Sequence, residues 1–210
     1  METKIFVINL ERSVDRRESM KRQLEHLALP YEFVKAVDGN CLTTEQLSKY
    51  SAQDSLRIHG RELTRAEIGC ALSHLGIYHR ILDERLRGAF VFEDDLRIGA
   101  DFVALIANRH RFPRDWELIK FCHANPRIVP RSQKTIMGEY RIVKFASRVA
   151  FAAAYVINQK GAAKLIKYAY PIRFAADGLT GRFMETGVRL YGIVPQVITQ
   201  GHFPSTIQVA

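Results

Sequence analysis

The chain has 210 residues, of which 47% are hydrophobic and 25% charged, and its formal net charge is +9. This much apolar material excludes a disordered chain, and the length suits a single domain over residues 1–210. The longest apolar run, residues 149–157, is too short to span a bilayer. The first residues are typical of a strand and not of a signal peptide, so we expect a cytoplasmic protein.

The positive charge calls for an anionic partner: a nucleic acid, a nucleotide, a phosphorylated glycolipid or an anionic membrane. Basic residues are spread along the chain and form no stripe interleaved with aromatic residues, so we expect no nucleic-acid partner. The three cysteines, Cys41, Cys70 and Cys122, are widely spaced. Their spacing fits neither a disulfide framework nor a CxxC metal site and predicts buried, reduced thiols.

The first third of the chain predicts an alternation of strands and helices. Residues 4–9 are predicted as a strand, Ser13 as the cap of the helix that follows, and residues 31–37 as a second strand. This order is typical of an α/β fold with a parallel sheet. A short helix is predicted at residues 43–50. Residues 51–62 are polar and lack periodicity, which predicts a mobile loop.

The clearest predicted helix begins at Thr64 and runs to about Leu86. Thr64 and Glu67 have the T-x-x-E spacing of a capping box, and apolar residues recur along one face. The elements predicted after this helix are a strand at 89–92, a helix at 100–108, a strand at 116–122, a hairpin arm at 136–145, a buried strand at 149–157, a helix at 159–169 and a last strand at 189–198. Pro195 within the last strand favours an edge position.

A strand that ends in three carboxylates is the most informative feature of the sequence. The apolar run at residues 89–92 is followed at once by Glu93, Asp94 and Asp95. Adjacent like charges repel one another unless positive charge lies among them, and hard cations such as Mg²⁺ or Mn²⁺ bind carboxylate oxygens. Ligands of open α/β sheets bind just beyond the carboxyl ends of the strands. These acids therefore indicate a divalent metal site, with a solvated acidic turn as the alternative.

Five segments carry a resemblance to a known family. They are Val7–Leu10 with Asp15–Arg17, Ala36–Gly39, Leu63–His74, Phe92–Asp95, and Ala154–Ile157 with Gly161–Leu165 followed by Asp177. The third segment contains E-x-G-C-x-x-S-H, and E-D-D follows about 20 residues later. In this order and spacing the chain resembles glycosyltransferase family 25, which includes bacterial lipooligosaccharide galactosyl- and glucosyltransferases and the procollagen galactosyltransferases.

The resemblance implies a GT-A-like fold, an α/β, Rossmann-like architecture with a mixed, mainly parallel sheet flanked by helices. It also implies a UDP-sugar donor and a divalent metal cofactor, Mn²⁺ or Mg²⁺. Asp95 is the first expected metal ligand and Glu93 the next, because alternate residues of an extended segment point the same way. His202 is a further expected ligand, with a simple loop residue as the alternative. Asp94 is expected to bind the donor sugar or ribose.

Other donor-binding residues are expected in two groups. Those at the ends of the first two strands are Asn9, Leu10, Arg16 and Asp38, and those in the helix block are Glu67, Ser73 and His74. Simpler alternatives are a solvated first-turn residue for Arg16, a turn former for Asp38, a capping partner for Glu67 and a structural role for His74. The strand and this helix are sequential neighbours, so His74 could reach the acids.

Asp177 is the expected catalytic base. An inverting transferase needs one carboxylate to take the proton from the attacking hydroxyl. Glu185 is the reserve candidate, and the alternative for Asp177 is a helix N-cap.

The function expected from these residues is metal-dependent, inverting transfer of a hexose, with galactose as the first choice. The hexose would pass from a UDP-sugar to a lipooligosaccharide or lipopolysaccharide core acceptor, with peripheral contact to an anionic inner membrane. The alternatives are a metal-dependent nucleotidyltransferase, an inactive relative, or a basic module that binds nucleic acid or membrane.

Overall fold

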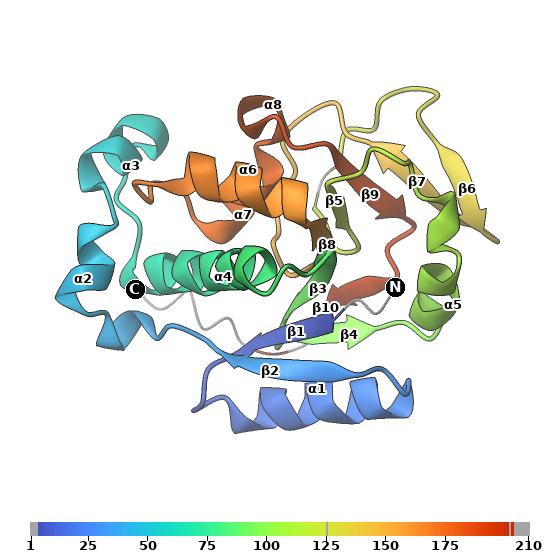
Figure 1. Cartoon of the computed structure of the whole chain (residues 1–210), viewed down its shortest axis with the longest axis horizontal. Helices are drawn as coiled ribbons and strands as arrows, with labels where there is room; N and C mark the ends of the chain where they lie inside the picture. The colour runs from blue at the N-terminus through green and yellow to red at the C-terminus, as the bar shows by residue number, and fades with distance from the viewer. Residues whose placement is uncertain (1–3, 125, 202, 204–210) are drawn as a thin grey trace.

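The computed structural model describes residues 4–124, 126–201 and 203. Its centre is a mixed sheet whose described strands lie in the order β2-β1-β3-β8-β5-β9-β7-β6 (Figure 1). These strands are β1 (Lys4–Asn9), β2 (Tyr31–Lys35), β3 (Gly88–Glu93), β5 (Leu118–Lys120), β6 (Lys134–Met137), β7 (Tyr140–Lys144), β8 (Ala154–Asn158) and β9 (Leu190–Val194). β1 pairs in parallel with β2 and β3, and β5 with β9, whereas the other described pairs of this sheet are antiparallel. A separate small sheet joins β4 (Leu96–Ile98) to β10 (Ile198–Gln200).

Helices cover both faces of the main sheet. In Figure 1, α4 (Arg65–Asp83) and α6 (Gln159–Ala169) lie on one side and α1 (Val14–His26) lies on the other. The shorter helices are α2 (Thr44–Ser48), α3 (Ala52–His59), α5 (Phe102–Ala107), α7 (Ala176–Gly181) and α8 (Phe183–Thr186), with 3-10 turns η1 (Gly39–Cys41) and η2 (Arg109–Arg111). No helix in the described part of the chain is both long and apolar enough to cross a membrane.

Alternation of side chains along β1 explains how both faces are filled. Phe6 and Ile8 are buried in the core that contains α4 and α6, whereas Ile5 and Val7 are buried in the core that contains α1. Because successive side chains of a strand point to opposite faces, a strand covered on both sides is apolar throughout. This is the origin of the continuous apolar runs in the sequence. The predicted α/β class, a mixed sheet flanked by helices, is confirmed.

The start of α4 is also as predicted. Thr64 Oγ1 accepts a hydrogen bond from the Glu67 N–H, and the Glu67 carboxylate accepts one from the Thr64 N–H, which completes the capping box. Ser13 precedes α1, as expected, but its side chain makes no capping hydrogen bond within the described chain. Of the three cysteines, Cys122 is buried as predicted, but Cys41 is exposed.

Residues 51–62 are not a loop, and that prediction is wrong. They contain α3, whose N-terminus is capped by Ser51, which accepts a hydrogen bond from the Asp54 N–H. The helix ends at Gly60, which has a φ of +71°. Capping at both ends defines this short helix.

The last long strand is not at an edge of the sheet, contrary to the prediction. β9 pairs with β5 on one side and β7 on the other, and it ends at Val194, so Pro195 lies beyond the ladder. The strand predicted at residues 149–157 begins only at Ala154. The carbonyl groups of residues 149–151 instead accept hydrogen bonds from the buried Lys120 Nζ, so they are not in a ladder.

Two glycines let the backbone of α4 touch the turn that follows β2. A Cβ on Gly69 would lie 2.5 Å from the carbonyl oxygen of Val37, and a Cβ on Gly39 would lie 2.5 Å from that of Arg65. A real side chain cannot approach a backbone atom this closely, so both positions require glycine. This contact fixes the helix beside the carboxyl ends of β1 and β2.

We expect Gly69→Ala to lower the free energy of unfolding by about 2 kcal/mol, because the added methyl group would overlap the Val37 carbonyl oxygen. Gly76→Ala in the same helix is the matched control. Gly76 is exposed, and none of the described atoms that could obstruct its Cβ lies within 4 Å, so this change should add about 0.5–1 kcal/mol of stability. Urea unfolding followed by circular dichroism measures both changes. Equal effects would contradict the required close approach at Gly69.

Candidate active site

A cleft of about 970 Å³ opens at the carboxyl ends of the parallel strands β1, β2 and β3. The first turns of α1 and α4 and the end of β10 form its walls. The sequence-predicted site residues that line it are Leu10, Arg16, Asp38, Ser73, Glu93, Asp94 and Asp95. Its position beyond the strand ends and its volume are typical of a small-molecule site.

Asp94 is held by side chains from β1 and α1. Arg16 Nη1 donates to Asp94 Oδ1 at 2.9 Å, and Asn9 Nδ2 donates to Asp94 Oδ2 at 2.7 Å. All three residues are buried. A buried carboxylate is stable when a cation and hydrogen bonds satisfy it, so the cation and the amide fix the acidic segment to the start of α1.

Asp95 keeps one buried carboxylate oxygen without a hydrogen bond from the described residues. Its Oδ1 atom is buried, and no atom of the described chain donates a hydrogen bond to it. Arg16 Nη1 lies 3.8 Å from Oδ2. Burial and then the charge of Glu93 raise the pKa of Asp95 to about 6, against the lowering effect of Arg16. An unsatisfied carboxylate oxygen beside two other acids is what a hard divalent cation binds, so these residues fit the metal that the resemblance implies.

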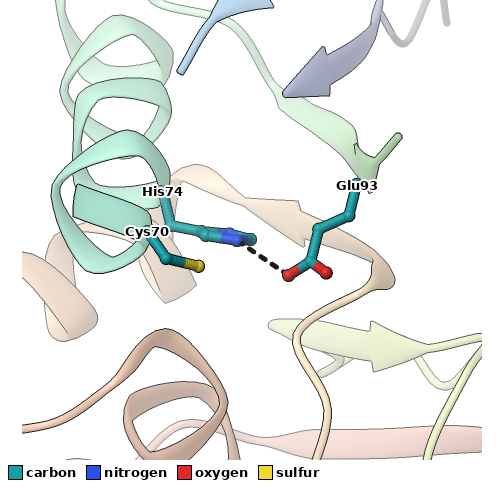
Figure 2. Close-up of side chains that lie close together, drawn as sticks. All are labelled: Cys70, His74 and Glu93. Carbon is teal, nitrogen blue, oxygen red and sulfur yellow. Dashed lines mark ion pairs between the residues drawn. The ribbon is translucent and has the colours of Figure 1, made fainter. Parts of the chain in front are cut away.

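The Glu93 side chain points at His74 of α4, with Cys70 beside it (Figure 2). His74 Nε2 lies 3.4 Å from Glu93 Oε1, which confirms that this histidine reaches the acids. His74 is 1% exposed, and its Nδ1 is hydrogen-bonded to the Tyr155 hydroxyl at 2.8 Å. The Tyr155 hydroxyl in turn is 2.7 Å from that of Tyr78. The imidazole is therefore held on one side by buried hydroxyls and faces a carboxylate on the other.

Burial and carboxylates from several parts of the chain raise the pKa of the Cys70 thiol. Burial raises the pKa of the Cys70 thiol well above its ordinary value, and the charges of Glu93, Asp177, Glu67 and Asp95 raise it further, in that order. The predicted metal ligands and the predicted base are therefore within electrostatic range of a single thiol.

Two residues of the helix block are engaged within the protein. Ser73 Oγ accepts a hydrogen bond from the Val37 N–H and donates one to the Gly69 carbonyl oxygen, so it ties α4 to the end of β2. Glu67 forms a two-point ion pair with Arg61 in addition to its role in the capping box. Ser73 lines the cleft, whereas Glu67 is not among its lining residues.

Asp38 and Leu10 lie where the sequence places them, at the strand ends. Asp38 accepts a hydrogen bond from the Asn40 N–H at 2.9 Å, which caps η1, and it forms an ion pair with Arg12. It is therefore a turn former and a cleft residue at once. Leu10 follows β1 and contributes apolar surface to the cleft.

The two candidate bases have different surroundings. Asp177 lies in the first turn of α7, within electrostatic range of Cys70 and Lys120. Burial raises the pKa of Glu185, but hydrogen bonding to Arg148 and the charges of both neighbouring arginines lower it overall. His202, the third expected metal ligand, lies outside the described residues.

Sequence reasoning missed three residues of this region. Cys70 precedes His74 by four positions, and that spacing on a helix places both on one face, so C-x-x-x-H could have indicated the pair. Arg12 gives no local signal of its ion pair with Asp38. Tyr155 lies in an apolar run, and its contact with His74 joins residues that are far apart in the sequence.

The fold and the cleft define an α/β ligand-binding domain with an acidic site at the ends of parallel strands. A sequence profile of glycosyltransferase family 25 (LPS biosynthesis protein) matches residues 2–180. The chain is 34% identical over 171 residues to procollagen galactosyltransferase 1 of Danio rerio and 35% identical over 170 residues to procollagen galactosyltransferase 2 of Homo sapiens. The chain belongs to glycosyltransferase family 25, and the resemblance drawn from its motifs is confirmed.

The alignments differ in how much of each protein they cover. They include 78% and 77% of this chain but 28% and 27% of the Danio rerio and Homo sapiens proteins. The chain therefore spans little more than a quarter of the length of these curated relatives. A protein of Drosophila melanogaster described as a glycosyltransferase 25 family member is 32% identical over 172 residues, which are 78% of this chain and 27% of that protein.

Two solved structures are similar at low sequence identity. One is a glycosyltransferase involved in the glycosylation of the major capsid of PBCV-1, with a TM-score of 0.39 and 7% identity over 80% of this chain and 66% of that one. The other is mouse xyloside xylosyltransferase 1, with a TM-score of 0.41 and 13% identity over 89% of this chain and 70% of that one. Both TM-scores are below 0.5, so these likenesses carry no argument about the site.

We expect the metal-free protein to lose stability as the pH rises from about 4 to about 6. The pKa of Asp95 in the folded chain, about 6, lies above its ordinary value of 3.8. The folded chain therefore keeps a proton here that the unfolded chain has released, and removing it disfavours the folded state. The loss through this residue is on the order of 3 kcal/mol.

Asp95→Asn should remove this pH dependence. In EDTA the variant is expected to be more stable than the wild type at about pH 7 and equal to it near pH 4, as measured by urea unfolding. Asp83→Asn, at an exposed position at the other end of α4, is the matched control and should leave the pH dependence unchanged. A less stable Asp95→Asn protein at neutral pH would contradict the interpretation.

Proposed function

We propose that this chain is a metal-dependent glycosyltransferase that moves a hexose from a UDP-sugar to a hydroxyl group of its acceptor. Family membership supports transfer of a sugar. The cleft at the strand ends supports a small-molecule donor of nucleotide size. The acids at the end of β3 support a cation in the same cleft.

The observation that carries the proposal is the buried Asp95 oxygen that no described residue satisfies. We infer that Asp95, with Glu93 as the second ligand, holds Mn²⁺ or Mg²⁺. When bound, the ion would supply positive charge to the diphosphate as it leaves. Asp94 is fully engaged by Arg16 and Asn9, so its contribution is to hold the acidic segment in place.

Two helix N-termini support the placement of a diphosphate. The first turns of α1 and α4 both line the cleft, and the free N–H groups at a helix start attract anions. Arg65 lines the same cleft and adds positive charge, and Arg12, which also lines it, is paired with Asp38. The base and ribose would lie over Leu10 and Asp38 at the ends of β1 and β2, which is where nucleotides bind in open α/β sheets.

Asp177 is the proposed base. It would take the proton of the acceptor hydroxyl while that oxygen bonds to the anomeric carbon and the bond from that carbon to the diphosphate oxygen breaks. Attack opposite the leaving group inverts the anomeric configuration. The surroundings of Glu185 favour Asp177, because two arginines already neutralise Glu185 and lower its pKa, which makes it a weak base.

Galactose is the proposed sugar, because the similar proteins of Danio rerio and Homo sapiens are named procollagen galactosyltransferases. A lipooligosaccharide or lipopolysaccharide core is the proposed acceptor, because the family is described as LPS biosynthesis protein. The net charge of +9 supports an acceptor that carries phosphates at an anionic inner membrane, approached from the cytoplasm by peripheral contact.

We expect Mn²⁺-dependent release of UDP from UDP-galactose by the wild type, measured with and without acceptor and compared with UDP-glucose. Asp95→Asn should lower this turnover at least about 100-fold, because it removes a charge that holds the cation. Circular dichroism should show that the variant keeps its fold. Asp83→Asn should retain full turnover.

A different set of outcomes would overturn the proposal. If neither UDP-sugar is turned over and UDP does not raise the melting temperature in Mn²⁺, the cleft does not bind this donor class. The chain would then act as a basic binding module or an inactive relative. Release of pyrophosphate from a nucleoside triphosphate would indicate a nucleotidyltransferase.

We expect Asp177→Asn to lower kcat for transfer by about 100-fold or more with little change in UDP affinity, because general-base catalysis is lost and the donor contacts remain. Glu185→Gln should keep kcat within about 3-fold, because Glu185 is engaged in ion pairs with Arg148 and Arg182 and is not expected to act on the substrate. Single-turnover kinetics with a saturating donor separate the two effects. A larger loss in Glu185→Gln than in Asp177→Asn would assign the base to Glu185 instead.

A further inference from the structure

Three side chains of different chemistry converge at the back of the cleft. Cys70 and His74 lie one turn apart on α4, and Glu93 faces them from the end of β3 (Figure 2). The Cys70 Sγ, a ring nitrogen of His74 and a carboxylate oxygen of Glu93 all lie within 4.8 Å of one another. Thiolate, imidazole and carboxylate are the ligands with which proteins bind zinc.

The imidazole is the part of the cluster that indicates a ligand. Only 1% of His74 is exposed, and no described residue makes a hydrogen bond to its Nε2. Nε2 lies 3.4 Å from Glu93 Oε1. Two ligand atoms on one tetrahedral ion, each about 2.0–2.1 Å from it, are separated by about 3.3 Å. The spacing is therefore that of two ligands of one ion.

The other ring nitrogen of His74 already has a hydrogen-bond partner, which fixes the orientation of the ring. Nδ1 of His74 is hydrogen-bonded to Tyr155, whose hydroxyl is hydrogen-bonded to Tyr78. When Nδ1 donates to Tyr155 and Tyr155 donates to Tyr78, the lone pair of Nε2 is directed at Glu93 and Cys70. Metal-binding histidines use this arrangement, in which a hydrogen bond at one nitrogen fixes the other toward the ion.

The local charge also calls for a cation. Glu93 places a carboxylate oxygen within 4.8 Å of the Cys70 sulfur, and Asp94 and Asp95 follow Glu93 directly in the chain. Of the nearby cations, Arg61 pairs with Glu67, and Arg16 lies against Asp94 and Asp95. Cys70 and Glu93 both line the cleft, so an ion has a route to them from solvent.

We propose that Cys70 Sγ, His74 Nε2 and the Glu93 carboxylate form a three-ligand site for a Zn²⁺-class ion, with the fourth position open to the cleft. Binding breaks the thiol S–H bond, forms the bond from sulfur to the ion, and releases the proton to solvent. The soft thiolate and the imidazole select zinc over Mn²⁺ and Mg²⁺, which prefer oxygen ligands. The site does not depend on glycosyl transfer. It lies beside the Asp95 position proposed for the donor cation, with Glu93 as a ligand of both positions.

Zinc titration of the reduced, metal-free full chain tests this site. A competing chromophoric chelator should report one tight Zn²⁺ equivalent, and Co²⁺ in its place should give near-ultraviolet absorbance from a sulfur-to-cobalt transition. Cys70→Ser and His74→Gln should each weaken zinc binding by about 100-fold or more, and Tyr155→Phe by about 10–100-fold. Cys41→Ser, at the exposed cysteine of η1, is the matched control and should leave the affinity unchanged.

A second readout does not require any variant to fold. In the wild type, zinc should protect Cys70 from alkylation while the exposed Cys41 reacts at the same rate, as read by mass spectrometry of the modified peptides. Absence of a tight zinc equivalent, of protection at Cys70, or of the cobalt–sulfur absorbance would overturn the proposal. So would zinc binding that survives Cys70→Ser but is lost in Asp95→Asn. Zinc binding that survives Asp95→Asn while UDP-sugar turnover is lost would support two separate cation positions.

Discussion

Negative charge concentrated at the end of β3 is the constraint on which the site depends. The protein meets it in three different ways. Asp94 is neutralised by Arg16 and fixed by Asn9, Glu93 faces the ring of His74, and Asp95 keeps a buried oxygen unsatisfied. The neighbouring strand and the two covering helices supply these partners. The arrangement of the sheet and its helices therefore determines how the negative charge in the cleft is balanced.

Local patterns predicted the elements that build the site. The apolar runs identified β1 and β3 because both faces of these strands are covered, and the spacing of Thr64 and Glu67 placed the start of α4. Sequential neighbours pack together, so the approach of His74 to the acids also followed from chain order. Each of these inferences uses information carried within a few residues or between adjacent elements.

The remaining features depend on contacts between distant segments. Tyr155 of β8 contacts His74 of α4, and Lys120 donates to the carbonyl groups of residues 149–151, which precede the start of β8. No local pattern contains either contact. The edge position predicted from Pro195 was wrong for a related reason. A proline just past the end of a central strand and a proline within an edge strand look alike in sequence. The cap at Ser51 is a local signal, and α3 was missed although its sequence does mark the start of a helix.

The contact between Gly39 and Gly69 bears on how this cleft can diverge among relatives. Backbone meets backbone there, so the position of the cleft wall does not depend on the identity of any lining side chain. Substitutions at positions such as Leu10 or Ala66 would alter which molecule fits while the wall stays where it is. The same sheet and helices can therefore come to serve new donors through side-chain changes alone, as long as the two glycines are kept.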